Sequence, residues 1–301
     1  MTQDSRIPRL AALLIAASSV AIACSAAPAS AYDGDWLRDQ VRAARSGATI
    51  EVPAGDYDIK DLRITKDLRL VGPTGAEAIF RSAETTDKGL LIPTEGASLH
   101  VENITFRNTS SWDRNGAGIR HEGVNLDIVN CVFDSNEDGV LATGSPEGVI
   151  TIKGSTFVDN GFGDGQSHGI YVFAADTLSI TDSKFIGTRI GHHVKSLADK
   201  TIVANTLLDD AYGRTSYAID TSKGGDVTIV NNTVIQSVDS DNSAIFNYDL
   251  TRGGAPVGIR IEGNKIINRY DGGRLLRNAT RLEPTIANNT VTNEGRRPLK
   301  E

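Results

Sequence analysis

Cysteine is nearly absent from this chain, which limits how its fold is stabilised. The 301 residues include only two cysteines, Cys24 and Cys131. Cys24 falls in an N-terminal segment that we expect to be removed, so Cys131 would be the only cysteine of the mature protein. A lone thiol excludes an intrachain disulfide. We expect Cys131, beside a bend at Asn130, to be a packed structural thiol and not a nucleophile.

The chain also has fewer basic than acidic residues. The chain has 31 Lys and Arg against 38 Asp and Glu, a net charge of −7. Removal of residues 1–31 takes away two Arg and one Asp, which leaves 29 against 37, or −8. The overall field of an acidic protein does not attract polyanions, so we expect no nucleic acid partner. An acidic glycan would have to be held by a local cationic patch.

The N-terminal apolar run, residues 10–23, is too short and too rich in Ala and Ser for a transmembrane helix. Arg6 and Arg9 precede this run, and residues 29–31 form an Ala-Ser-Ala cleavage site. This is the pattern of an export signal. We therefore predict a signal peptide over residues 1–31 and no membrane span.

The mature chain, residues 32–301, is long enough for one domain, which we expect to be monomeric and secreted or periplasmic. Lipid anchoring through Cys24 is the alternative, although residues 21–23 lack the leucine that usually precedes a lipidated cysteine. Residues 35–47 are predicted to form an amphipathic helix that caps the first turn of the fold.

One short phrase recurs eight times and predicts the fold. Each copy has alternating apolar residues, then Asn, Gly or Asp, then a further apolar residue. The copies are residues 99–106, 126–133, 150–157, 178–185, 201–208, 227–234, 259–266 and 284–291. The bend residues are Asn103, Asn130, Gly154, Asp182, Asn205, Asn231, Gly263 and Asn288. Alternation indicates a strand with one buried face, and bends spaced 23 to 32 residues apart indicate a β-solenoid.

A second strand precedes most copies of the phrase. Its expected inward residues are Ile119, Val140, Ile170, Val194, Ile219, Ile245 and Leu276. Regularly spaced leucines and a helical return segment are missing, which excludes a leucine-rich repeat. The pattern over residues 34–295 resembles the right-handed parallel β-helices of the pectin-lyase-like superfamily. The predicted class is therefore an all-β, right-handed parallel β-helix with an N-terminal capping helix.

Candidate functional residues follow from the alternation of the second strands. Residues one step after the inward column face outward. They are Arg120, Leu141, Tyr171, Lys195, Asp220, Phe246 and Arg277. The column one step earlier contains Gly118, Gly139 and Gly169, then His193, which we expect beside Lys195. Glycine permits close approach of a ligand, so we predict a low floor for an extended sugar chain.

Two loops are expected to converge on the coils of Lys195. They are residues 159–168 and 211–217. They would bring further titratable groups to the same face. The expected additions are His168, His192, Arg214 and Tyr217.

The segment 193–196, His-Val-Lys-Ser, with Asn205-Thr206 one phrase later, resembles the lysine region of polysaccharide lyase family 6, the chondroitinase B and alginate lyase group. The resemblance implies that Lys195 removes the C5 proton of a uronic acid, aided by calcium and an arginine. The acidic calcium ligands expected upstream are replaced by residues 188–193, and Asp220 stands where the arginine is expected. We therefore assign no metal ligand, and calcium stays open as a cofactor.

The favoured function is a lyase that cleaves an acidic polysaccharide by β-elimination. Lys195 or His193 would be the base, Tyr171 or Tyr217 would protonate the leaving oxygen, and Arg214 or Arg120 would hold the carboxylate. His168, His192 and Asp220 would contact the substrate. Three alternatives stay open, namely a uronate C5-epimerase, a polygalacturonase-like hydrolase and a glycan-binding protein without catalysis.

Overall fold

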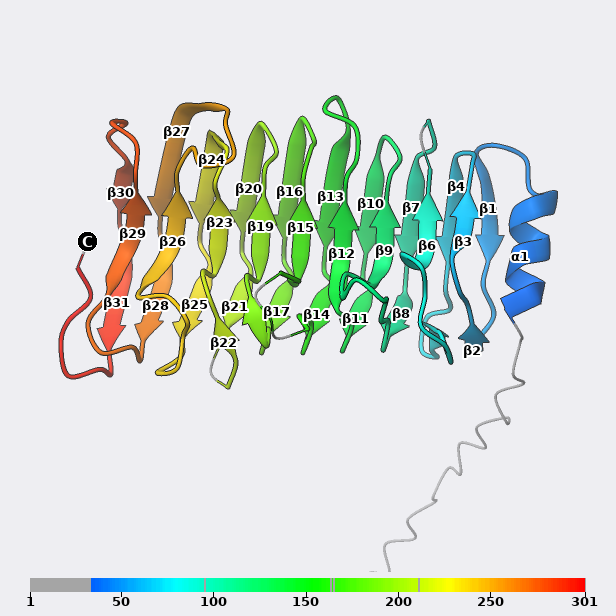
Figure 1. The fold of residues 1–301 in the computed structure, drawn as a ribbon, viewed down its shortest axis with the longest axis horizontal. Helices are drawn as coiled ribbons and strands as arrows, with labels where there is room; N and C mark the ends of the chain where they lie inside the picture. Colours follow the sequence, from blue (N-terminus) through cyan, green and yellow to red (C-terminus); the bar gives the residue numbers. More distant parts are fainter. Residues whose placement is uncertain (1–33, 95, 163, 165, 211, 301) are drawn as a thin grey trace, which may run out of the picture.

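The computed structural model describes residues 34–94, 96–162, 164, 166–210 and 212–300. The described chain is a parallel β-solenoid with one short helix, α1 (Gly34–Ala43), at its N-terminal end (Figure 1). The predicted fold is confirmed. The expected signal peptide, residues 1–31, lies outside the described residues. No helix in the described ranges is long and apolar enough to span a membrane.

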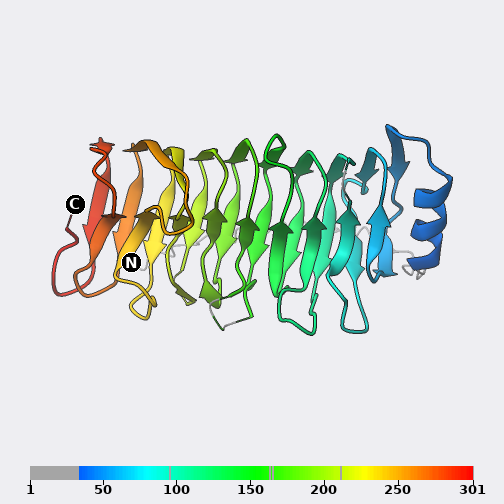
Figure 2. The same ribbon diagram turned by 45° about the horizontal axis from the view of Figure 1, so that its top comes forward.

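Three parallel sheets run along the solenoid, and each coil except the last contributes a strand to each of them (Figures 1 and 2). Sheet A contains β1 (Ala48–Glu51), β4 (Leu68–Val71), β7 (Leu99–Glu102), β10 (Leu126–Val129), β13 (Val149–Lys153), β16 (Thr177–Thr181), β20 (Lys200–Ala204), β24 (Gly224–Val230), β27 (Ala255–Glu262) and β30 (Thr285–Ala287). Sheet B contains β2 (Gly55–Asp58), β5 (Ala78–Arg81), β8 (Ile104–Arg107), β11 (Val132–Asp134), β14 (Thr156–Val158), β17 (Lys184–Ile186), β21 (Leu207–Asp209), β25 (Thr233–Gln236), β28 (Lys265–Asn268) and β31 (Thr290–Asn293). Sheet C contains β3 (Leu62–Ile64), β6 (Gly89–Pro93), β9 (Ala117–His121), β12 (Asp138–Ala142), β15 (Ile170–Val172), β19 (Val194–Ser196), β23 (Ile219–Thr221), β26 (Ala244–Tyr248) and β29 (Arg274–Asn278). A small extra pair, β18 (Ile190–Gly191) and β22 (Arg214–Thr215), lies in the loops between sheets B and C.

The repeated phrase forms the corner between sheets A and B. The eight predicted bend residues all have positive φ, between 51° at Asn130 and 67° at Gly263. Asn, Asp and Gly tolerate this left-handed conformation better than other residues, which explains their selection at the fifth place of each phrase. The apolar residues on either side then face the interior.

A ladder of aromatic rings fills the interior beside sheet B. Its last four members are the phenylalanines of β8, β11, β14 and β17. The rings of Phe106 and Phe133, of Phe133 and Phe157, and of Phe157 and Phe185 are stacked at 4.8, 4.6 and 4.5 Å. The prediction of a capping helix is also confirmed, because Leu37 and Val41 of α1 are buried against the first coil.

The inward column of sheet C is confirmed with one correction. Val140 pairs with Ile119 and Ile170, and Val194 pairs with Ile170 and Ile219. In β26, however, the partner of Ile219 is Phe246, and Asn247 is the partner of Asp220. The prediction that Ile245 belongs to this column and that Phe246 faces outward is therefore wrong by one residue. Both side chains are buried in the core.

Candidate functional site

The glycine column at the start of sheet C does not form a floor for a ligand. A Cβ on Gly139 would collide with the ring of Phe157, and one on Gly118 would lie 2.9 Å from Phe133. A Cβ on Gly169 would likewise lie 3.1 Å from the ring of Phe185. These glycines therefore face the interior, where they leave room for the phenylalanine ladder. The predicted glycine floor is wrong.

His193, which follows the glycines in this column, also lies inside the solenoid. It is fully buried, its Nδ1 lies 2.8 Å from the hydroxyl of Thr188, and its ring faces Phe185 at 6.3 Å. Burial lowers its pKa to about 3, so the ring is neutral. The expectation that His193 projects beside Lys195 is wrong. In the next coil the partner of Phe185 is Leu208 of β21, so the run of phenylalanines ends at the coil of His193.

Tyr171, Lys195 and Asp220 do form an outward row, as the alternation predicts. They are register partners on β15, β19 and β23. The Lys195 ammonium lies 4.5 Å from the centroid of the Tyr171 ring, a cation–π contact. Burial lowers the pKa of Lys195 and Arg252 lowers it further, whereas Asp220 acts in the opposite direction. Burial also raises the pKa of Tyr171, so its phenol stays protonated.

Asp220 is the centre of a hydrogen-bond network on this face. Its carboxylate accepts bonds from Asn247 Nδ2 at 2.7 Å and from Ser222 Oγ at 3.3 Å. Asn247 Oδ1 in turn accepts a bond from Arg277 at 2.6 Å, and Arg277 also pairs with Asp249 at 2.5 Å. Burial raises the pKa of Asp220. The network holds Asp220 beside Lys195.

His168 and His192 stack at the edge of the same face. Their ring centroids are 4.9 Å apart, and His192 stacks in turn on Tyr217 at 5.3 Å. Nδ1 of His168 accepts the backbone N–H of His192, and Nδ1 of His192 accepts that of Tyr217, each at 3.0 Å. Burial lowers the pKa of His192 to about 3 and that of His168 well below its usual value. Each neutral ring therefore carries its proton on Nε2, and that of His192 lies 3.5 Å from Asp220.

The remaining predicted residues lie farther from this cluster. Arg120 is partly buried on β9 and pairs with Glu122 at 3.5 Å. Arg214 is exposed on β22, where it pairs with Ile190 of β18 and not with a strand of sheet C. Within the described ranges, no hydrogen bond or ion pair joins Arg214 to Lys195. The expected convergence of Arg214 on the face is wrong.

Sequence reasoning gave no role on this face to two titratable residues near Lys195. Arg252 is exposed in the loop after β26, its backbone N–H donates to Ser222, and its charge acts on both Lys195 and Tyr171. Asp138 is fully buried on β12, and burial raises its pKa well above the usual range. The position of Asp138 one place before Gly139 was the available signal. Arg252 lies in a loop whose course the repeat does not predict.

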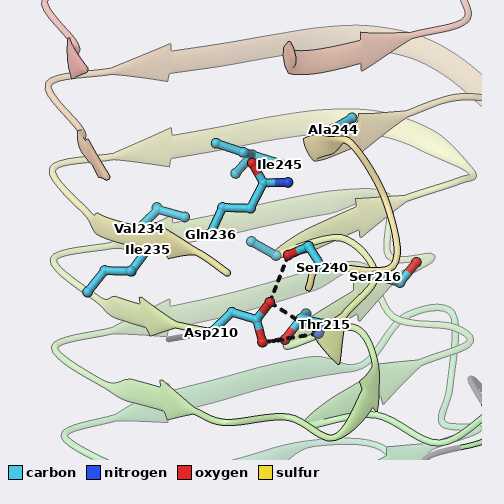
Figure 3. A pocket seen from close by; sticks show the side chains of 10 residues that line it. Asp210, Thr215, Ser216, Val234, Ile235, Gln236, Ser240, Ala244 and Ile245 are labelled. Atoms are coloured by element: carbon cyan, nitrogen blue, oxygen red, sulfur yellow. Dashed lines mark hydrogen bonds between the residues drawn. The ribbon is translucent and has the colours of Figure 1, made fainter. Parts of the chain in front are cut away.

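A pocket at the corner of sheets B and C is too small for a sugar. Figure 3 shows its lining, which includes Asp210, Thr215, Gln236 and Ser240. Its volume of about 10 Å³ holds at most one water molecule. Its polar groups have a structural role, since Asp210 accepts bonds from Thr215 and Ser240.

The face as a whole defines a parallel β-helix protein with a lysine, a tyrosine and an aspartate in one outward row. The chain belongs to the family described as "Periplasmic copper-binding protein (NosD)", which it matches over residues 82–252. No curated protein matches the chain.

Two solved structures align with this chain. The PL6 family alginate lyase AlyGC aligns with a TM-score of 0.50 and 15% identity, over 87% of this chain and 39% of that one. An alginate lyase from Paenibacillus sp. str. FPU-7 aligns with a TM-score of 0.45 and 15% identity, over 89% of this chain and 96% of that one. At this identity the likeness concerns the fold alone.

The described residues do not fit a copper ion. Copper sites are built from imidazole, thiolate and thioether ligands. The structure, within the ranges it describes, contains no group of three or more His, Cys, Asp or Glu side chains that could hold a metal ion. Cys131 is buried as predicted, and burial raises its pKa to about 12, which disfavours the thiolate. Nδ1 of both stacked histidines is already occupied by backbone N–H groups.

Proposed function

We propose that the chain is a polysaccharide lyase that binds a uronate-containing glycan on sheet C and cleaves it by β-elimination. The observation that carries this proposal is the position of Lys195, which faces outward beside Tyr171 and Asp220 with a lowered pKa. A lowered pKa increases the fraction of neutral amine near neutral pH, and a general base requires that form. The periplasmic description of the family supports a place outside the cytoplasm.

In the proposed reaction, neutral Lys195 Nζ takes the proton from C5 of the uronate. The electron pair of that C–H bond forms the C4–C5 double bond, and the bond from C4 to the glycosidic oxygen breaks. The Tyr171 phenol, whose pKa is raised by burial, donates a proton to the leaving oxygen. Arg252 holds the substrate carboxylate and stabilises the negative charge that develops on it. Asp220, held by its own network, supplies negative charge that stabilises the protonated Lys195 formed in this step.

The decisive experiment incubates the protein with alginate, polygalacturonate and chondroitin and follows ultraviolet absorbance of the unsaturated product. We expect Lys195→Ala to lower turnover by about 10²–10⁴, the usual contribution of a general base, without loss of the fold. The matched control is Lys184→Ala on sheet B, an exposed lysine away from this face. New reducing ends without absorbance, or deuterium exchange at C5 without cleavage, would contradict the lyase proposal.

A further inference from the structure

The loops that lead from sheet B into sheet C stack on one another along the solenoid. Gly161 N–H donates to Asn136 O at 3.1 Å, and Arg189 N–H donates to Asn160 O at 3.0 Å. Arg214 N–H continues the series by donating to Arg189 O at 3.1 Å. Consecutive loops are therefore about one strand spacing, ~4.8 Å, apart.

Three large aromatic side chains are exposed on this edge, and they come from alternate loops. Trp112 is 85% exposed in the loop before β9, Phe162 is 40% exposed in the loop before β15, and Tyr212 is 64% exposed in the loop before β23. One coil separates each from the next, so their backbones lie about 10 Å apart along the axis. A polymer that runs along the axis would meet the three side chains in turn.

Three arginines accompany these aromatic residues. Arg114, Arg189 and Arg214 are all exposed in the same series of loops. None of the three forms an ion pair with another described residue, whereas the neighbouring Asp113 is engaged by Lys88 and Ser111. The Arg114 guanidinium lies 4.8 Å from the centroid of the Phe162 ring. We call the six side chains the corner ridge: Trp112, Arg114, Phe162, Arg189, Tyr212 and Arg214.

Thr215, which follows Arg214 in the chain, is anchored by Asp210. Asp210 accepts hydrogen bonds from the Thr215 N–H at 3.0 Å, from the Thr215 hydroxyl at 2.6 Å and from the Ser240 hydroxyl at 2.8 Å (Figure 3). The Tyr212 ring lies against Gly187 of the preceding coil, where a Cβ would collide with it. A side chain that is already ordered loses less entropy on binding.

We propose that the corner ridge binds an extended anionic polysaccharide that runs along the solenoid axis. Sugar rings stack on the three aromatic side chains, and the arginines contact carboxylates that would otherwise be repelled by this acidic protein. The ridge lies on the loops that lead into the strands of Tyr171, Lys195 and Asp220, so a polymer held there runs alongside that face. The inference takes its substrate class from the proposed function, but it concerns affinity and not turnover.

The test measures binding of alginate and polygalacturonate oligomers by calorimetry in a Lys195→Ala background, in which the polymer stays intact. One variant combines Trp112→Ala, Phe162→Ala and Tyr212→Ala, and another combines Arg114→Gln, Arg189→Gln and Arg214→Gln. We expect each triple variant to weaken binding by about tenfold. A tenfold change equals ~1.4 kcal/mol, and each of the three exposed contacts contributes a fraction of it. Only the arginine variant should lose the salt dependence of binding.

The matched control changes three exposed arginines far from the ridge to glutamine, and it should leave the affinity unchanged. They are Arg45, Arg281 and Arg296. Unchanged affinity in both ridge variants would overturn the inference, as would equally tight, ridge-dependent binding of a single-stranded thymidine oligomer. If wild-type protein cleaves no polymer yet binds it through the ridge, the ridge inference stands and the lyase proposal fails.

Discussion

The outward face of sheet C has two halves of opposite character. Toward the N-terminus it carries the Arg120–Glu122 pair and an apolar cluster of nearly buried side chains, namely Ala117, Leu141, Tyr171 and Leu197. Toward the C-terminus the same face carries the hydrogen-bonded network of Asp220, Asn247, Asp249 and Arg277. Lys195 lies at the boundary. One half removes water from its amine and the other offers a carboxylate, so the pKa of Lys195 reflects two opposing influences.

The largest expected effect tests the register of β19, on which this comparison depends. Val194 is fully buried in the core, while Lys195 points outward. Val194→Asp places an unpaired carboxylate in the interior, which costs several kcal/mol, and we expect the protein to unfold or to melt at a much lower temperature. Lys200→Asp, at an exposed position of sheet A, is the control for added charge. An unchanged melting temperature for Val194→Asp would show that the register is reversed.

The buried histidines should make stability fall in mild acid. Burial lowers the pKa of His121 to about 4 and those of His192 and His193 to about 3, and His168 is shifted in the same direction. Because an unfolded histidine titrates near pH 6.5, the unfolded chain binds protons below that pH that the folded chain does not. Each histidine therefore contributes a loss of roughly 1.4 kcal/mol per pH unit below about pH 6.

Urea unfolding at pH 8, 6 and 5 measures this dependence. Asp138 acts in the opposite direction because its pKa is raised, so the histidine effect is isolated by comparison with His193→Gln. The unfolding free energy of this variant should fall less steeply between pH 6 and pH 5 than that of the wild type. The difference in slope should correspond to about one bound proton. Parallel curves for the two proteins would contradict the assignment of His193 as a buried neutral group.

The smallest expected effect is a shift of the Lys195 pKa when one of its charged neighbours is removed. Asp220→Asn removes the anion that raises the pKa of Lys195, whereas Arg252→Gln removes a cation that lowers it. If the proposed lyase activity is present, the acid limb of its pH–rate profile should move to lower pH in Asp220→Asn and to higher pH in Arg252→Gln. Asp220→Asn should also reduce kcat by about tenfold, because the Lys195 ammonium that forms in the reaction loses this stabilising charge. Shifts of the same sign in both variants would exclude Lys195 as the titrating base.

The fold was predictable because its signals are local and repeated. Each Asn, Gly or Asp in the fifth place of the phrase adopts positive φ, and the alternating residues beside it determine which side chains are buried. The outward row of Tyr171, Lys195 and Asp220 followed from the same alternation. In β26 two adjacent apolar residues, Ile245 and Phe246, are both buried, so alternation alone could not determine the register there.

The parts of the site that were not predicted depend on contacts between coils. Strict alternation places His193 on the same side as Lys195, but β19 begins at Val194, and the chain turns a corner before it. Gly139 indicates interior crowding only once Phe157 of the following sheet B strand is known to lie against it. Arg252 and Arg214 lie in loops of irregular length, whose course does not follow from the period. The chemistry of the face was therefore predictable for residues on strands and not for residues at corners or in loops.

The stacked phenylalanines also influence where the solenoid begins to unfold. In a solenoid each coil contacts only its neighbours, so cooperativity is passed from coil to coil and unravelling starts where coupling is weakest. Phe106, Phe133, Phe157 and Phe185 couple the central coils through nearly parallel rings, while Ile286 and Val291 of the last coil are only partly buried. Amide exchange should be slowest at the middle and fastest toward the C-terminal end. The coils of Tyr171 and Lys195 are those of Phe157 and Phe185 and so belong to this central block, which keeps the face assembled while the far end frays.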